Sequence, residues 1–128
     1  MSENSHQIFG PLSRNALEIV ALRFKALSDP TRLSILQHLL NGEKTVGEIF
    51  KLTNMNQANI SKHLGVLLDQ GLVAKRKDGL FAYYRIEDDS VAKICELVCN
   101  SVSNRLDITH SEFKIAKKEK FRNYPNDN

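Results

Sequence analysis

The sequence predicts a mainly α-helical domain with one β-hairpin. Three observations lead to this prediction. Apolar residues recur at helical spacing through most of the chain. Breakers at Ser28-Asp29-Pro30 and Asn41-Gly42 divide that pattern into short helices. Further along, Asp78-Gly79 separates two short runs rich in strand-forming residues, which is typical of a hairpin.

The first two helices are expected over residues 13–27 and 30–40. Ser13 and Asp29 are candidate N-caps, because their side-chain oxygens can accept from the free amides of a first helical turn. Pro30 suits the first position of the second helix, where no amide hydrogen is needed. The apolar face of the first helix consists of Ala16, Leu17, Val20, Ala21, Phe24 and Leu27.

The next two helices outline a helix-turn-helix. A short helix over residues 45–52 is followed by a turn at 53–55 and by a helix from about 56 to 70, which Gly71 closes. Two helices joined by so short a turn are characteristic of this motif. The apolar face of the second is Ile60, Leu64, Leu67 and Leu68.

Residues 72–77 and 80–86 form the expected hairpin, and Asp88-Asp89-Ser90 then caps a last long helix. A helix-turn-helix followed directly by a hairpin is a winged helix-turn-helix, so the full order is four helices, two strands and a helix. The last helix carries an apolar stripe: Val91, Ile94, Cys95, Val98, Val102 and Leu106.

The domain organisation expected from composition has three parts. Residues 1–12 are a flexible lead-in, 13–112 form the winged domain with its dimerisation helices, and 113–128 are a basic, polar, disordered tail. The sequence offers neither an apolar run of about 18 residues nor a signal-peptide pattern, so we expect a cytoplasmic protein without a membrane partner. The chain's two cysteines should rest there as thiols.

Basic residues are concentrated in one window of the chain. Residues 51–85 contain six Lys or Arg and two Asp, a net charge of +4, whereas the whole chain carries +3 and the remainder therefore −1. A local basic excess is expected of a face that contacts phosphates. The alternative is an ordinary solvated surface.

The helix expected from about residue 56 presents short polar side chains that suit base edges in the major groove. Gln57 and Asn59 have the paired donor and acceptor that adenine N6 and N7 require. Ser61 and Lys62 suit phosphates, as does the basic end of the hairpin. The residues expected to contact double-stranded operator DNA are Asn56, Gln57, Ala58, Asn59, Ser61, Lys62, His63, Lys75, Arg76 and Lys77.

Several segments resemble the ArsR/SmtB family of metal- and stress-responsive repressors. Residues 24–36 read FKALSDPTRLSIL, and residues 56–64 are similar to the family's recognition helix, which often reads Ser-Gln-Ser-x-Val-Ser-Arg-His-Leu. Gly-Leu-Val at 71–73, the basic wing and Tyr-Tyr-Arg at 83–85 fit in order and spacing, so the resemblance covers about residues 13–106. It implies a homodimer formed mainly by the first and last helices, and a repressor that an effector releases from its operator.

The two metal sites that the resemblance implies are not matched. Thr45 and Gly47 occupy the thiol positions of the Cys-x-Cys site. The family's other site aligns with Asp88, Ser90, Ser101 and Asn104, of which only the aspartate fits. Zinc takes about four N, O or S ligands, so we expect no zinc control at these sites.

Cys95 and Cys99 remain as candidate effector or redox residues. Their i, i+4 spacing places them on one helix face, and a dimer joined by this helix brings four thiols together. Such a set suits a soft metal or metalloid, or oxidation or persulfidation of a thiol. The alternative is that both are small core residues.

An enzyme is not expected, because the sequence shows no glycine-rich phosphate loop, Ser-His-Asp order or paired acidic motif. Two alternatives stay beside the effector-released repressor. One is a winged-helix regulator with no small-molecule effector, and the other is a protein-interaction module on the same scaffold.

Overall fold

The computed structural model describes residues 10–87 and 89–106, and it confirms the predicted order of elements. The expectations for residues 1–9 and 107–128, and for Asp88 as part of a cap, lie outside the described residues. Element boundaries agree with the sequence predictions to within one or two residues. The elements are α2 (Arg14–Leu27), α3 (Pro30–Leu39), α4 (Val46–Thr53), α5 (Gln57–Asp69), β1 (Val73–Asp78), β2 (Phe81–Ile86) and α6 (Ser90–Leu106).

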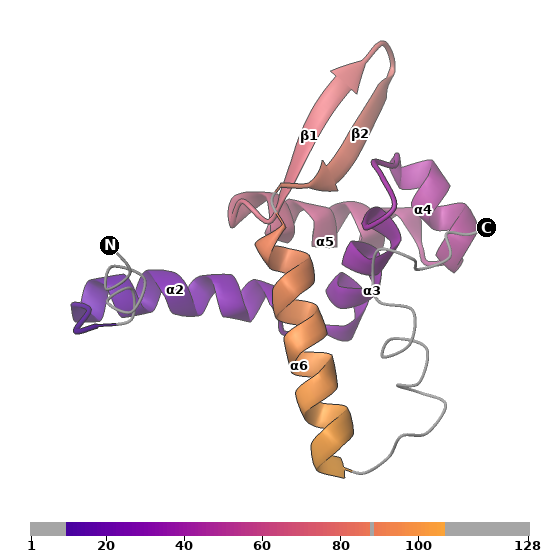
Figure 1. Cartoon of the computed structure of the whole chain (residues 1–128). Coiled ribbons are helices and arrows are strands. Elements are labelled where there is room, and N and C mark those ends of the chain that lie inside the picture. The colour runs from indigo at the N-terminus through magenta and orange to yellow at the C-terminus, as the bar shows by residue number, and fades with distance from the viewer. Residues whose placement is uncertain (1–9, 88, 107–128) are drawn as a thin grey trace.

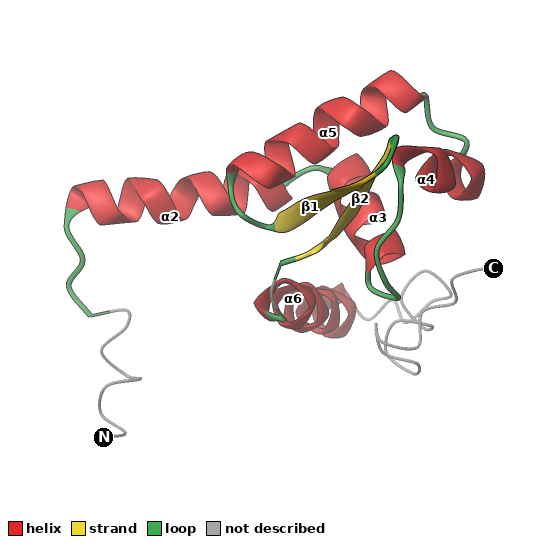
Figure 2. Cartoon of the chain, turned by 90° about the horizontal axis from the view of Figure 1, so that it is seen from above, coloured by secondary structure: helices red, strands yellow, loops and turns green. Residues whose placement is uncertain are grey.

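The hairpin projects from the helical body, and α2 extends from it to one side (Figure 1). The view from above places α5 and α6 on opposite sides of the base of the hairpin (Figure 2). Within the described ranges, no helix combines the length and apolar character needed to cross a membrane.

Local side-chain chemistry sets where the helices begin. The Ser13 hydroxyl accepts from the Ala16 amide at 3.0 Å. Asp29 Oδ2 accepts from the amides of Thr31 and Arg32 at 2.9 and 3.0 Å. The hydrogen bond from the Arg32 amide is the main reason that the pKa of the Asp29 carboxyl lies below its usual value. Both N-caps predicted from the sequence are therefore present.

The core lies between α3, α4, α5 and the start of the hairpin. Side chains from three helices are wholly buried there, and Leu72, Val73 and Tyr84 close the hairpin side. Val91 is the buried anchor of α6. The fully buried residues of α3, α4 and α5 are Ile35, Leu36, Ile49, Ile60, Leu64 and Leu67.

Much of the apolar stripe on the first and last helices is left exposed among the residues that the structure describes. In α2, only Ala26 and Leu27 are buried, whereas Phe24 is 57% exposed. In α6, Val98 and Leu106 are 55% and 54% exposed. A fourteen-residue helix with most of its apolar face in water gains little from packing, so these stripes are candidate interaction surfaces.

The wing is a two-stranded antiparallel hairpin widened by one bridge. β1 extends one residue further than expected, so the loop is Gly79-Leu80, with Gly79 at φ 65°. Lys44, in the segment before α4, exchanges two backbone hydrogen bonds with Tyr84, of 3.0 and 2.8 Å. The loop between α3 and α4 is therefore joined to the outer side of β2.

Candidate nucleic-acid interface

The turn of the helix-turn-helix is closed by its own side chains. The Thr53 hydroxyl donates to Ile49 O at 2.8 Å and accepts from the Met55 amide at 3.1 Å. Asn54 adopts the left-handed conformation at φ 64°, which asparagine tolerates better than most residues. The α4 side is fixed by a capping box between Thr45 and Glu48. The angle at which α5 leaves α4 is thus held locally.

The outward face of α5 is polar along its first half, and its inward face is fully buried. Ile60, Leu64 and Leu67 have no exposed surface, so α5 is fixed along its length against the core. The exposed residues on the opposite face are Gln57, Ala58, Asn59, Ser61 and Lys62. These five predicted DNA contacts are therefore brought together on one accessible surface.

Asn56 and His63, the first and last predicted contacts on this helix, have other partners. Asn56 Oδ1 caps α5 by accepting from the Asn59 amide at 3.1 Å. His63 is half-buried, and its Nδ1 lies 3.1 Å from Arg32 Nη1. The sequence placed both on the DNA-facing surface, whereas the structure uses the oxygen of one and a ring nitrogen of the other to hold α5.

Arg32 joins three helices, a role that was not predicted from the sequence. From α3, its Nε donates to Ala26 O at 2.6 Å and its Nη2 to Lys25 O at 3.3 Å, at the end of α2. Its third nitrogen contacts His63 on α5. We define these contacts as the Arg32 clamp. A contact 31 positions away in the chain leaves no local sequence signal.

The three basic residues of the wing have different surroundings, although all are exposed. Lys75 Nζ lies 5.8 Å from the centroid of the Tyr84 ring. Arg76 stacks on Tyr83, at 4.6 Å, and donates through Nε to both carboxylate oxygens of Glu43, at 3.0 and 3.2 Å. Since Arg76 is already paired with a carboxylate, its environment differs from that expected of a free phosphate-binding cation.

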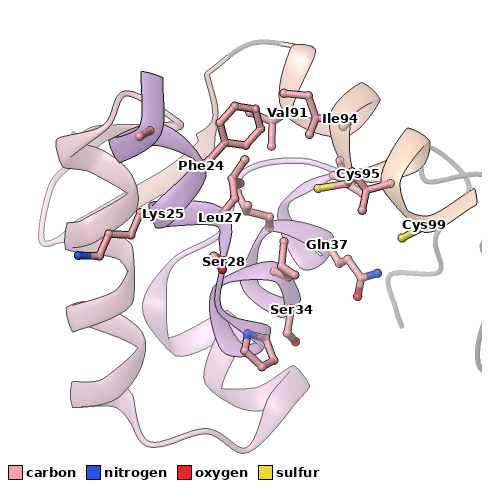
Figure 3. Close-up of a pocket in the computed structure, with 17 residues that line it drawn as sticks. Phe24, Lys25, Leu27, Ser28, Ser34, Gln37, Val91, Ile94, Cys95 and Cys99 are labelled. Atoms are coloured by element: carbon pink, nitrogen blue, oxygen red, sulfur yellow. The ribbon is translucent and has the colours of Figure 1, made fainter. Parts of the chain in front are cut away.

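A second feature is an apolar groove of about 750 Å³ between α2, α3 and α6. Cys95 and Cys99 lie on its α6 wall, with both sulfur atoms on the groove side of the helix (Figure 3). Burial raises the pKa of both thiols, and the neighbouring Cys99 raises that of Cys95 further. The two cysteines are therefore half-buried and predominantly protonated at neutral pH.

Metal-ligating side chains do not converge within residues 10–87 and 89–106 of a single chain. No three His, Cys, Asp or Glu side chains there lie close enough to hold an ion together. Two thiols from one protomer are fewer than the four ligands typical of zinc. A complete soft-metal site around Cys95 and Cys99 therefore needs ligands from elsewhere.

The chain is similar to known regulators over this same region. Residues 29–75 match the family model described as "Bacterial regulatory protein, arsR family". A probable mercury resistance operon repressor of Streptomyces lividans is 40% identical over 82 residues, which cover 63% of this chain and 66% of that protein. An uncharacterised HTH-type transcriptional regulator of Methanocaldococcus jannaschii is 45% identical over 76 residues, which cover 59% of this chain and 85% of that protein.

One solved structure is similar to this chain in both fold and sequence. It is the solution structure of a homodimeric winged helix-turn-helix DNA-binding domain from Mycobacterium bovis, described as a possible ArsR-family transcriptional regulator. It is 37% identical to this chain, with a TM-score of 0.65, and the match covers 81% of this chain and 97% of that domain. The exposed polar face of α5 and the neighbouring wing are consistent with what these comparisons show. The chain therefore belongs to the ArsR family of DNA-binding transcriptional regulators.

Proposed function

We propose that this protein is a homodimeric repressor that reads double-stranded operator DNA with the first half of α5. The observation that carries the proposal is the two-sided character of this helix. Its buried residues fix its orientation, while Gln57, Asn59 and Ser61 extend from the accessible side. Short polar groups on a rigid helix are suited to base edges in the major groove.

The wing supplies the sequence-independent part of the proposed interface. Lys75 and Lys77 are exposed on the hairpin next to its loop, where they can contact phosphates. Such contacts release counterions, so binding weakens steeply as salt rises. The measurement is fluorescence anisotropy with the tightest duplex selected from a random pool, over a range of salt concentrations. Failure to bind any duplex at low salt excludes a DNA-reading function and favours the protein-interaction alternative.

Replacing Gln57 with alanine is expected to weaken binding to the selected duplex by about 1–3 kcal/mol, because a paired donor and acceptor to a base is lost. Binding to a random-sequence duplex should stay unchanged, since Gln57 is proposed to contact a base and not a phosphate. The matched control is Gln70→Ala, at the C-cap of the same helix. Equal losses on both duplexes for Gln57→Ala contradict its assignment to a base edge.

The dimer is proposed to form through α2 and α6, whose exposed apolar stripes need a partner. A homodimeric relative supports dimer formation as such, and the exposed stripes are the reason for placing the interface on these two helices. A two-fold symmetric protein presents two recognition helices to two half-sites. The stripes also border the groove that contains Cys95 and Cys99. Dimer formation thus brings the thiols of two chains to one interface.

We propose that Cys95 and Cys99 respond to a soft, thiol-binding metal or metalloid ion. Raised pKa values leave few thiolates at neutral pH, which slows oxidation, whereas a soft ion displaces the proton as it binds. The relative from Streptomyces lividans, a probable mercury resistance repressor, supports this choice. A regulator without a small-molecule effector remains the alternative outcome.

The Cys95→Ser, Cys99→Ser double variant tests this proposal. It is expected to bind the selected duplex as the unchanged protein does, but to remain bound when Hg²⁺ or arsenite is added. In the unchanged protein, alkylation of both thiols at pH 7 should be slower than that of free cysteine and should accelerate as the pH rises. Release of the double variant by the same ions contradicts sensing through these thiols and assigns them to packing.

A further inference from the structure

Glu43, Arg76 and Tyr83 form a bridge between the wing and the loop that precedes α4. Arg76 on β1 lies opposite Tyr83 on β2 in the hairpin register, and its guanidinium carbon is 4.6 Å from the centroid of that ring. The same guanidinium donates to both carboxylate oxygens of Glu43 through Nε and to one of them through Nη2. We call these three residues the wing bridge.

The wing bridge crosses β2 next to a backbone connection. Glu43 is followed by Lys44, whose amide and carbonyl both bond to Tyr84. The loop between α3 and α4 therefore reaches β2 through the backbone, and it reaches β1 through the side chain of Arg76. Two attachments on successive strands resist rotation of the hairpin about its base more than either attachment alone.

The charge of Arg76 is used within the bridge. The hydrogen bond with Glu43 raises the pKa of the Arg76 guanidinium and lowers that of the Glu43 carboxyl. A second carboxylate also faces Arg76, because Asp78 Oδ2 lies 3.7 Å from its Nη1. The Arg76 guanidinium is stacked on a ring and faces two carboxylates. Lys77, by contrast, is exposed near the loop and forms no ion pair with the residues that the structure describes.

We propose that Glu43 and Arg76 are positioning residues for DNA binding: they fix the wing so that Lys75 and Lys77 reach the phosphate backbone. Arg76 acts through the orientation of the hairpin and makes no phosphate contact of its own, contrary to the role expected from the sequence. This inference rests on the proposed DNA interface.

Net charge and positioning predict opposite results for Glu43→Gln. The protein carries +3, so removing this carboxylate gives +4, and a purely electrostatic interface then binds DNA more tightly. If the bridge positions the wing, the same substitution weakens binding by about three- to tenfold, the range of a lost charge-assisted contact. Arg76→Gln carries +2 and should weaken DNA binding by a similar factor. Both explanations predict this loss, so the Glu43→Gln variant is the one that separates them.

The double variant Glu43→Gln, Arg76→Gln separates the two effects. Its net charge stays at +3, because one negative and one positive side chain are both made neutral. Electrostatics alone therefore predicts unchanged affinity, whereas the bridge predicts a loss no greater than that of either single variant, because both remove one interaction. Lys77→Gln is the control, and it should lower the slope of log affinity against log salt by about 0.9.

The experiment measures dissociation constants and salt slopes for these four variants, together with amide hydrogen exchange of Tyr84 without DNA. We expect weaker binding for the three bridge variants, because DNA must then order a loosened wing, and faster exchange at Tyr84. Their salt slopes should stay unchanged, because Lys75 and Lys77 still contact phosphates once the wing is ordered. Tighter binding by Glu43→Gln, a slope for Arg76→Gln lowered like that of Lys77→Gln, or unchanged exchange at Tyr84 overturns the inference. A different outcome is that the unchanged protein binds no DNA while the bridge variants still exchange the Tyr84 amide faster than it does. In that case the proposed function fails, and the bridge remains a structural restraint on the wing.

Discussion

Val98→Asp is expected to convert the dimer to monomers and to lower affinity for the selected duplex by about 100-fold or more. Val98 is 55% exposed in the single chain, so an aspartate there costs the folded monomer little. In a dimer joined by α2 and α6, the same carboxylate is buried against apolar side chains without a partner, which is strongly unfavourable. Each monomer then binds a half-site alone and loses the gain from linked binding.

The control is Asn100→Asp, which introduces the same charge two residues away, on the opposite side of α6. Sedimentation velocity should show monomers for Val98→Asp and dimers for Asn100→Asp, with unchanged helical circular dichroism in both. A Val98→Asp protein that stays dimeric places the interface elsewhere. A monomeric variant that keeps full affinity instead contradicts the requirement for two linked recognition helices.

The uncovered helices also show a limit of prediction from periodicity. The spacing of Leu17, Val20 and Phe24 correctly predicts an apolar face on the first helix, yet all three are exposed in the chain. A hydrophobic period identifies a face that must be covered, but carries no information on whether the covering surface belongs to the same chain. By contrast, the stripe of α5 at Ile60, Leu64 and Leu67 is buried within the chain, as expected.

Local chemistry was predictable where the interacting groups are close in sequence. Ser13 and Asp29 cap their helices because the amides they accept from lie two or three residues away. The hairpin followed equally from Asp78-Gly79 and its flanking strand-forming residues. Helix and strand boundaries, and hence the winged helix-turn-helix, could therefore be derived from short segments.

The contacts that hold the candidate interface in place were not predictable in this way. Glu43 reaches Arg76 across 33 positions, and Arg32 reaches His63 across 31. Each residue by itself is an ordinary polar or charged side chain in the sequence. The internal partners of Arg76 and His63 therefore could not be predicted from the sequence, and the direct DNA contact expected of both residues stays a prediction.

Arg32→Ala is expected to lower the free energy of unfolding by about 1–3 kcal/mol and to weaken DNA binding. The substitution removes the Arg32 clamp and leaves Ala26 O, at the end of α2, without its 2.6 Å donor. It also frees the ring of His63 on α5, so the recognition helix loses one of its links to the helix proposed to form the dimer. Chemical denaturation measures the first effect, and anisotropy with the selected duplex measures the second.

Two further variants distinguish the geometry of the clamp from its charge. Arg32→Lys keeps the charge but lacks the planar fork that reaches Ala26 O, Lys25 O and His63 together, so we expect it to restore little of either property. Arg14→Ala removes an arginine whose side chain is 87% exposed and whose ion pair with Glu18 lies within one helix, and it should change stability by less than about 0.5 kcal/mol. If Arg32→Lys is as stable and binds as tightly as the unchanged protein, charge alone is sufficient at this position. If it restores neither, the three hydrogen bonds of one guanidinium are what couple the proposed dimer helix α2 to the recognition helix α5.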